Sequence, residues 1–313
     1  MSLGTPPKLR RLQEALYTKA KQEPAYRFYL LYDKVYRTDI LAHAYALSKQ
    51  HGGAPGVDGV TFADIEAAGV EQWLAAVQEA LRTETYRPHP VRRVLIPKPG
   101  GIGERPLGIP VIRDRVVQTA ALLILQPIFE GDLDPPTAYG YRPGRTALEA
   151  VQAVHRALCA GHTEVIDADV SSYFDSIPHA ALLKSLARRI CDRRMLRLLK
   201  GWLKAPVAER GPGGGWRFRG GKRATRGTPQ GGVVSPLLAN WGKEPAGGSP
   251  RRSLSTSRRA ASRRCTRRSV GTTPTWWTTS GPWASAGASL STSRSLYPNP
   301  RPGLACGSLF EVL

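Results

Sequence analysis

The stretch IDADVSSYFDSIPH, residues 166–179, decides both the fold expected for this chain and its chemistry. It begins as a strand, predicted from Glu164 to Val170, and turns after it. Asp167 and Asp169 are two residues apart, so on a strand their carboxylates share one face. A carboxylate at the end of a buried strand is costly unless it holds a metal ion or a hydrogen-bonded partner.

Two interpretations of these carboxylates stay open. Hard oxygen ligands suit Mg²⁺, which usually keeps some waters and takes one or two carboxylates together with substrate phosphates. Alternatively, the pair is structural, and nearby arginine side chains or backbone N–H groups satisfy it. The segment alone favours neither interpretation.

Two further segments carry candidate functional residues. In TRGTPQGGVVSPLLAN, residues 225–240, a proline and two glycines surround Gln230, so a substrate could approach the backbone closely, although an ordinary turn before a helix would look the same. In IPKPGGIGERPLGIP, residues 96–110, Lys98 and Arg105 lie on either side of a predicted hairpin tip. Such a pair can hold a triphosphate, although a solvated basic hairpin is the commoner explanation.

The net charge of the 313 residues is +21, which makes a polyanion the expected partner. Residues 1–240 hold 34 Lys and Arg against 22 Asp and Glu, and residues 241–313 hold 11 against 2. Residues 1–240 would therefore be basic even without residues 241–313. The alternative is a surface that is basic only for solubility.

Composition also excludes several classes of protein. No apolar run approaches the roughly 18 residues of a membrane span, and the first residues do not resemble a secretory signal. The four cysteines form no CxxC pair, which argues against a zinc site or a disulfide framework. Their spacing fits a reducing compartment, so we expect a cytoplasmic protein without a membrane partner.

Hydrophobic periodicity predicts an α+β fold, with helices alternating with strands and hairpins. A glycine-rich segment, GPGGGWRFRGGKR, predicts a second hairpin after residue 210. The expected helices cover residues 8–22, 25–49, 65–85, 113–129, 145–159, 179–190 and 193–203.

The composition changes abruptly after Asn240. Residues 241–313 contain no Asp, Ile, His, Gln or Met, but four of the seven tryptophans. Serine and threonine dominate, arginine pairs interrupt them, and there is no sustained periodicity. So few aliphatic residues cannot offset the conformational entropy of folding, so we expect a disordered tail. The expected domains are therefore residues 1–240 and 241–313.

Five segments, in this order, resemble bacterial group II intron reverse transcriptases, also called intron-encoded maturases. They are HGGAPGVDGVT, YRPHPVRRVLIPKPGGIGERPLGIPVIRDRVVQ, LQPIFEGDLDPPTAYGYRPGRTALEA, IDADVSSYFDSIPH and GTPQGGVVSPLLAN. The resemblance covers nearly all of residues 25–240. It implies a right-hand polymerase, of which this chain would hold the fingers and part of the palm, with RNA-directed DNA synthesis as the activity of the intact family.

The resemblance also implies roles for single residues. Asp169 matches the first catalytic, metal-binding aspartate, with the carbonyl of Val170 as a ligand beside it and Mg²⁺ as the cofactor. Lys98 and Arg105 match the residues that would hold the triphosphate of the incoming nucleotide. Gln230 matches the residue that would lie against that nucleotide. Tyr173 or Phe174 would supply the aromatic plate that excludes a ribose 2′-hydroxyl. Many relatives have a basic residue where this chain has Glu104, which weakens the triphosphate assignment.

The resemblance also exposes a gap. Two metal ions about 3.5–4 Å apart need several carboxylates. The family supplies two of them from a Tyr-Ala-Asp-Asp hairpin, and that sequence does not occur here. A shift of reading frame after Asn240 would produce the composition of residues 241–313. We therefore expect a polymerase fragment that is inactive as written.

The implied partners are the host intron RNA, a DNA primer or target, and deoxynucleoside triphosphates. Two alternatives to a polymerase fragment stay open. One is a non-catalytic, maturase-like protein that binds intron RNA. The other is a non-functional pseudogene product.

Overall fold

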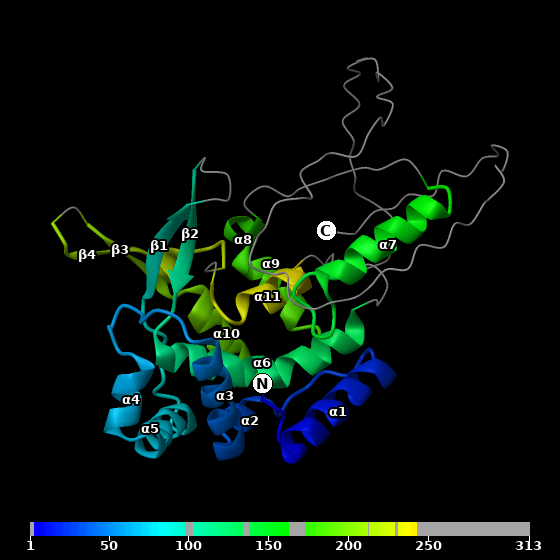
Figure 1. Ribbon diagram of the computed structural model, residues 1–313. Helices are drawn as coiled ribbons and strands as arrows, with labels where there is room; N and C mark the ends of the chain where they lie inside the picture. The colour runs from blue at the N-terminus through cyan, green and yellow to red at the C-terminus, as the bar shows by residue number, and fades with distance from the viewer. Residues whose placement is uncertain are drawn as a thin grey trace, which may run out of the picture. The chain divides into compact units, whose positions relative to one another are not determined.

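Figure 1 shows the computed structural model, which describes residues 3–97, 103–133, 138–162, 173–211, 213–228 and 231–242. The strand predicted from Glu164 to Val170 lies outside these ranges. So does the predicted tail, except for its first two residues.

A long buried helix, α6 (Ile112–Asp132), forms the centre of the fold. Buried residues occur around most of its circumference, and they include the polar or charged Asp114, Arg115 and Gln118 as well as apolar side chains. Three N-terminal helices pack against it: α1 (Pro7–Gln22), α2 (Tyr32–Val35) and α3 (Thr38–His51). The predicted helices at 8–22 and 113–129 are confirmed.

The single helix predicted over residues 25–49 is wrong: residues 25–31 are not helical, and Tyr36 and Arg37 separate two helices, α2 and α3. Residues before α2 run extended, because the backbone of Phe28 pairs with residues 189–191: its N–H donates to Arg189 O at 2.8 Å, and its carbonyl accepts from Cys191 N at 2.9 Å. The Asp192 carboxylate then accepts the N–H groups of Leu31 and Tyr32 at 2.9 and 2.8 Å. These distant partners satisfy the backbone in place of helical hydrogen bonds.

The helix expected over 65–85 is present as two helices, α4 (Phe62–Ala68) and α5 (Val70–Arg82). Thr61 and Asp64 form a capping box that starts α4. Gly69 separates the two helices with a φ of +98°, a conformation that favours glycine.

Four strands form one mixed sheet in the order β2-β1-β3-β4. They are β1 (Val91–Pro97), β2 (Glu104–Ile109), β3 (Pro206–Arg210) and β4 (Trp216–Gly220). β1 with β2 and β3 with β4 form antiparallel hairpins, and a short parallel pairing of Val91 with Val207 joins the two. The first hairpin is confirmed, whereas the second begins earlier than predicted, because β3 precedes the glycine-rich segment that starts at residue 211. The tip of the first hairpin lies outside the described residues.

The remaining helices complete an α+β fold and confirm the predicted class. They are α7 (Ala147–Cys159), α8 (Tyr173–Ser176), α9 (His179–Leu186), α10 (Arg193–Leu203), the 3₁₀ turn η1 (Gly221–Arg223) and α11 (Ser235–Gly242). Within the described part of the chain, no helix has the length and apolar character needed to cross a membrane.

Helix α11 runs past the predicted domain boundary at Asn240. Trp241 is only 3% exposed, and its ring centre lies 4.4 Å from that of Phe129 in α6. The packed structure therefore includes Trp241, which lies beyond the predicted boundary.

Candidate functional site

The two segments with predicted palm chemistry lie side by side. Residues of α8 and just beyond it bond to the segment before Gln230: Thr228 N donates to Phe174 O at 2.7 Å, and Gly227 N donates to Ile177 O at 2.9 Å. These backbone bonds join the end of IDADVSSYFDSIPH to the start of GTPQGG, although more than forty residues separate them in the sequence.

A buried histidine strengthens this junction. His179 Nε2 lies 2.7 Å from Gly227 O, and its backbone N–H donates to Thr225 O at 2.9 Å. Since a carbonyl oxygen only accepts, Nε2 carries the proton. Sequence reasoning missed His179, because a histidine at the start of a helix gives no signal of its own.

Two glycines allow the chain segments to approach closely. Gly227 has a φ of +88°, and a Cβ atom there would lie 3.1 Å from Asp175 O. Gly231 has a φ of +103°, and its Cβ would lie 2.5 Å from Gly108 O. Because Gly108 belongs to β2, the strand that also carries Arg105, the segment around Gln230 reaches the fingers hairpin.

The structure thus brings parts of all three predicted elements together. Arg105 is exposed on β2, directly opposite Ile96 of β1. Asp169, Val170, Lys98 and Gln230 lie outside the described residues, so their predicted roles stay predictions. In the described part of the chain, no three His, Cys, Asp or Glu side chains are grouped so that they could hold a metal ion.

The two aromatic candidates are placed differently. The Tyr173 hydroxyl donates to Ala239 O of α11 at 2.7 Å, and burial raises the pKa of Tyr173. The ring of Phe174 lies between two others, 6.0 Å from Tyr173 and 6.2 Å from Tyr141, both edge to face. Both residues belong to α8, but the Tyr173 hydroxyl is tied to α11, whereas Phe174 contacts the rings of Tyr173 and Tyr141.

Tyr141 is a residue that sequence reasoning missed. It is 67% exposed and has a φ of +58°, which is rare for a residue with a side chain. Its neighbour Arg142 is buried and pairs with Glu130 of α6 at 2.9 Å, which fixes the loop. Asn240 Nδ2 also donates to Gly140 O at 3.0 Å. Strained backbone in an exposed, anchored loop is a signal that only coordinates supply.

A cavity of about 230 Å³ lies between the sheet and the joined palm segments. Arg93, Arg219 and Arg226 line it together with Asp175. Glu209 pairs with Arg93 at 2.8 Å and with Arg219 at 3.3 Å. Glu209 thus partly neutralises Arg93 and Arg219 at the edge of this cavity.

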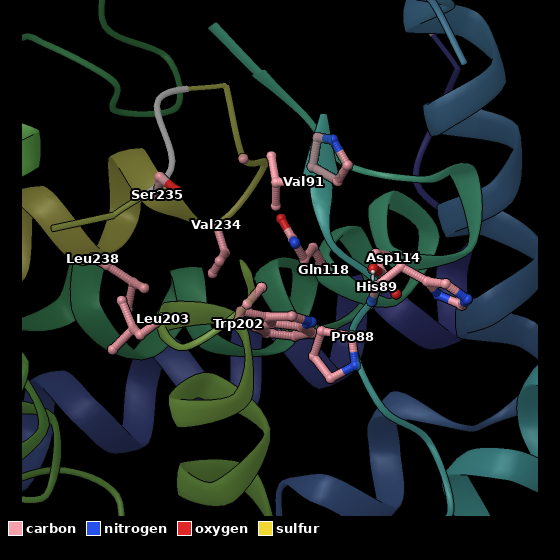
Figure 2. Close-up of a pocket in the computed structure, with 13 residues that line it drawn as sticks. Pro88, His89, Val91, Asp114, Gln118, Trp202, Leu203, Val234, Ser235 and Leu238 are labelled. Carbon is pink, nitrogen blue, oxygen red and sulfur yellow. Dashed lines mark hydrogen bonds between the residues drawn. The ribbon is translucent and has the colours of Figure 1, made fainter. Parts of the chain in front are cut away.

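A second, much smaller pocket of about 10 Å³ lies between α6, α10 and the start of β1 (Figure 2). Asp114 accepts hydrogen bonds from Tyr86 Oη at 2.6 Å and from His89 N at 2.8 Å. Burial raises the pKa of Asp114, and it raises the pKa of Tyr86 well above its ordinary value. The space is about that of one water, so we interpret this network as the anchor of β1 on the core.

Comparison with known proteins agrees with this architecture. The family model described as "Reverse transcriptase (RNA-dependent DNA polymerase)" matches residues 96–246, six residues further than the resemblance seen in the sequence. Protein YkfC of Escherichia coli (strain K12) is 40% identical over 235 residues, which are 73% of this chain and 59% of that protein.

Intron-encoded proteins are also similar to this chain. The group II intron-encoded protein LtrA of Lactococcus lactis subsp. cremoris is 34% identical over 214 residues, 68% of this chain and 34% of LtrA. Nuclear intron maturase 2, mitochondrial, of Arabidopsis thaliana is 33% identical over 95 residues, 30% of this chain and 13% of that protein.

The matched part of the chain thus spans less than two thirds of the length of these relatives. The family model covers the later of the five segments, from the fingers hairpin through GTPQGGVVSPLLAN. Residues 96–246 are therefore a reverse transcriptase domain, and the chain belongs with the group II intron reverse transcriptases and intron maturases.

Proposed function

We propose that this chain provides the fingers and part of the palm of an RNA-directed DNA polymerase that acts with a group II intron. The observation that supports it best is the contact between Gly231 and Gly108, because it joins the segment around Gln230 to the strand that carries Arg105. The bonds from α8 to Gly227 and Thr228 add the segment that follows Asp169.

In this proposal the fingers hairpin holds the incoming deoxynucleoside triphosphate. Lys98 and Arg105 bind its phosphates, since guanidinium and ammonium groups make charge-assisted hydrogen bonds to phosphate. Gln230 lies against the nucleotide. Phe174 is a better aromatic plate than Tyr173, because the Tyr173 hydroxyl is already bonded to Ala239 O.

Asp169 and the carbonyl of Val170 would hold a divalent cation, Mg²⁺ by the chemistry of these oxygen ligands. When bound, such a cation stabilises negative charge on the phosphoryl oxygens during nucleotidyl transfer. The chain's own residues position the nucleotide and the strand that is extended.

The proposed macromolecular partners are the host intron RNA and a DNA primer or target. The excess of Lys and Arg in residues 1–240 supports a phosphate backbone as the partner of the folded part. The names of the relatives point the same way, since several are intron-encoded or intron maturases.

Primer extension on an RNA template tests the proposal. The 313 residues as written contain no Tyr-Ala-Asp-Asp sequence, so we expect no DNA synthesis with Mg²⁺ or Mn²⁺. With the reading frame restored after Asn240, synthesis should appear, and Asp169→Ala should remove it. DNA synthesis by the unaltered chain would contradict our assignment of the missing carboxylates.

A second candidate is a maturase-like protein that binds intron RNA without polymerising. The large positive charge together with the missing hairpin favours it. It predicts tight, salt-sensitive binding of structured RNA by the unaltered chain, with a steep fall of affinity as salt rises. Primer extension by the repaired chain combined with weak RNA binding would favour the polymerase over this candidate.

A further inference from the structure

The β3–β4 hairpin has two chemically different faces. We call residues 206–223, which comprise β3, β4 and η1, the β3–β4 arm. Arg210 pairs with Trp216 and Ala208 with Phe218, so these four side chains share one face. Arg217 and Arg219 alternate with the aromatic residues and point to the other face.

The aromatic face is held in place by an arginine. The Arg210 guanidinium lies 4.2 Å from the ring centre of Trp216, within cation–π range, and its Nη1 donates to Gly214 O at 2.6 Å. Phe218, next to Trp216 on this face, is 59% exposed. Two aromatic rings thus stand on the outermost strand of the sheet, and one of them is fixed by a cation.

The arm is also strongly basic. It contains five Lys and Arg residues and a single acid, Glu209. Arg217, Arg219 and Lys222 are exposed, and Glu209 pairs with Arg219 only at 3.3 Å. An exposed apolar side chain alone needs no explanation, but aromatic residues interleaved with cations are typical of surfaces that bind single-stranded nucleic acid.

The arm leads directly into the candidate site. After η1 the chain continues to Thr225 and Gly227, which bond to His179 and Ile177 beside α8. A strand bound to the arm would therefore lie at the approach to the palm. Figure 1 shows β3 and β4 extending away from helices α8 and α9, and Arg217, Phe218 and Arg219 of β4 are exposed.

We infer that the outer edge of the β3–β4 arm binds an unpaired stretch of RNA or DNA. A base stacks on the exposed ring of Phe218 on one face of β4, and Arg217, whose side chain lies on the other face, reaches a phosphate around the edge of the strand. Single strands fit better than duplexes, because the faces of paired bases are already stacked. The inference rests on the proposed function, since it assumes a nucleic-acid partner. It adds that an unpaired stretch of this nucleic acid binds to residues outside the predicted nucleotide site.

Fluorescence anisotropy of the full chain with a short labelled oligouridylate tests this inference. Phe218→Ala should weaken binding by about fivefold or more, the loss expected for one stacked base. Its effect on a blunt RNA duplex should be much smaller. Arg217→Gln should weaken both and lower the salt slope by about 1, as expected for one lost phosphate contact.

Tyr29→Ala is the matched control, because Tyr29 is also 59% exposed but lies before α2, in another part of the fold. It should change oligouridylate binding little. Circular dichroism of each variant checks that the fold is kept. If Phe218→Ala binds the single strand as tightly as the unaltered chain does, or if Tyr29→Ala loses as much, the inference is wrong while the proposed function stands. If the unaltered chain binds no RNA, both are wrong.

Discussion

The sheet contains two hairpins of the same construction that are used differently. In the β1–β2 hairpin, the edge strand is approached by Gly231, so the palm segments lie against it. In the β3–β4 hairpin, the edge strand carries the exposed ring of Phe218 and the half-buried ring of Trp216 on one face. Strand pairing is alike in the two hairpins, so what distinguishes them is the chain segment that packs on each.

This difference suggests that the two hairpins have different roles. The segment before the first hairpin is anchored to the core by the hydrogen bonds of Asp114, and the hairpin also contacts the palm segments. A rigidly held hairpin suits residues that must orient a nucleotide. The second hairpin is joined to the first by a short parallel pairing and by the ion pair between Glu209 and Arg93, while Glu209 also pairs with Arg219 within the second hairpin. Looser attachment suits a surface that receives a flexible strand.

The largest expected effect comes from breaking the approach of the palm to β2. Gly231→Ala would place a Cβ atom 2.5 Å from Gly108 O and 2.8 Å from Leu107 Cδ1, at a φ of +103°. Overpacking and backbone strain together should lower the free energy of unfolding by about 3 kcal/mol. Urea denaturation measures it.

Gly69→Ala is the control for backbone strain alone. Gly69 has a φ of +98°, but no atom lies within 4 Å of its would-be Cβ. It should cost about 1 kcal/mol, the usual penalty for a side chain at positive φ. Equal losses for the two variants would mean that the contact with β2 is not tight.

The next largest loss of stability should come from the hydrogen bonds that anchor the start of the first hairpin to the core. Asp114→Asn should lower the free energy of unfolding by about 2 kcal/mol, because Tyr86 Oη and His89 N donate to different carboxylate oxygens and Asn replaces one of these with an NH2 group, which donates. Asp33→Asn, at an exposed ion pair with Lys34, should stay within about 0.5 kcal/mol of the unaltered chain. A cost for Asp114→Asn no greater than that of Asp33→Asn would show that the buried network does not anchor β1.

A smaller effect should come from the link between the hairpins. Glu209→Gln removes the carboxylate that pairs with Arg93 and Arg219, and its side chain is 25% exposed. The loss of stability should be below about 1 kcal/mol and should shrink as salt increases. If the loss is large and independent of salt, the hairpins are joined more firmly than the parallel pairing suggests.

The smallest expected effect is a dependence on pH. Burial raises the pKa of Asp114 in the folded chain, so the folded state binds the proton more tightly than the unfolded state does. This contribution to stability is fully present below the unfolded pKa and is lost as pH rises through the folded one. The cost of Asp114→Asn should therefore be greater at pH 3 than at pH 7. Denaturation of both proteins at the two pH values measures it, and a cost that grows with pH would contradict the shift.

Much of the fold could be predicted because local signals are strong. Helix α7 begins at a Thr146–Glu149 capping box and ends where the sequence predicts. Both hairpins follow from alternation and from glycine-rich turns. The predicted site could be recognised only in pieces, because each segment alone also suits an ordinary turn or a solvated hairpin.

Three results could not be read from local patterns. Residues 25–31 have helical periodicity but pair with residues 189–192 instead. Trp241 stands at the start of an unusual composition but fills a space beside Phe129. Phe174 and Tyr173 are adjacent aromatic residues, and only the hydrogen bond to Ala239 O distinguishes them.

The sequence alone determined the positions of most helices, the two hairpins, the basic character and, through five ordered segments, the family. Those properties depend on neighbours within a few turns or strands, where capping, periodicity and turn residues act. Tertiary structure decided which backbone groups of residues 25–31 are satisfied by distant partners, which aromatic ring is tied down, and how closely Gly231 approaches β2. These depend on contacts between segments up to about 160 residues apart, such as Asp192 with Tyr32, and local pattern carries no information on such distances.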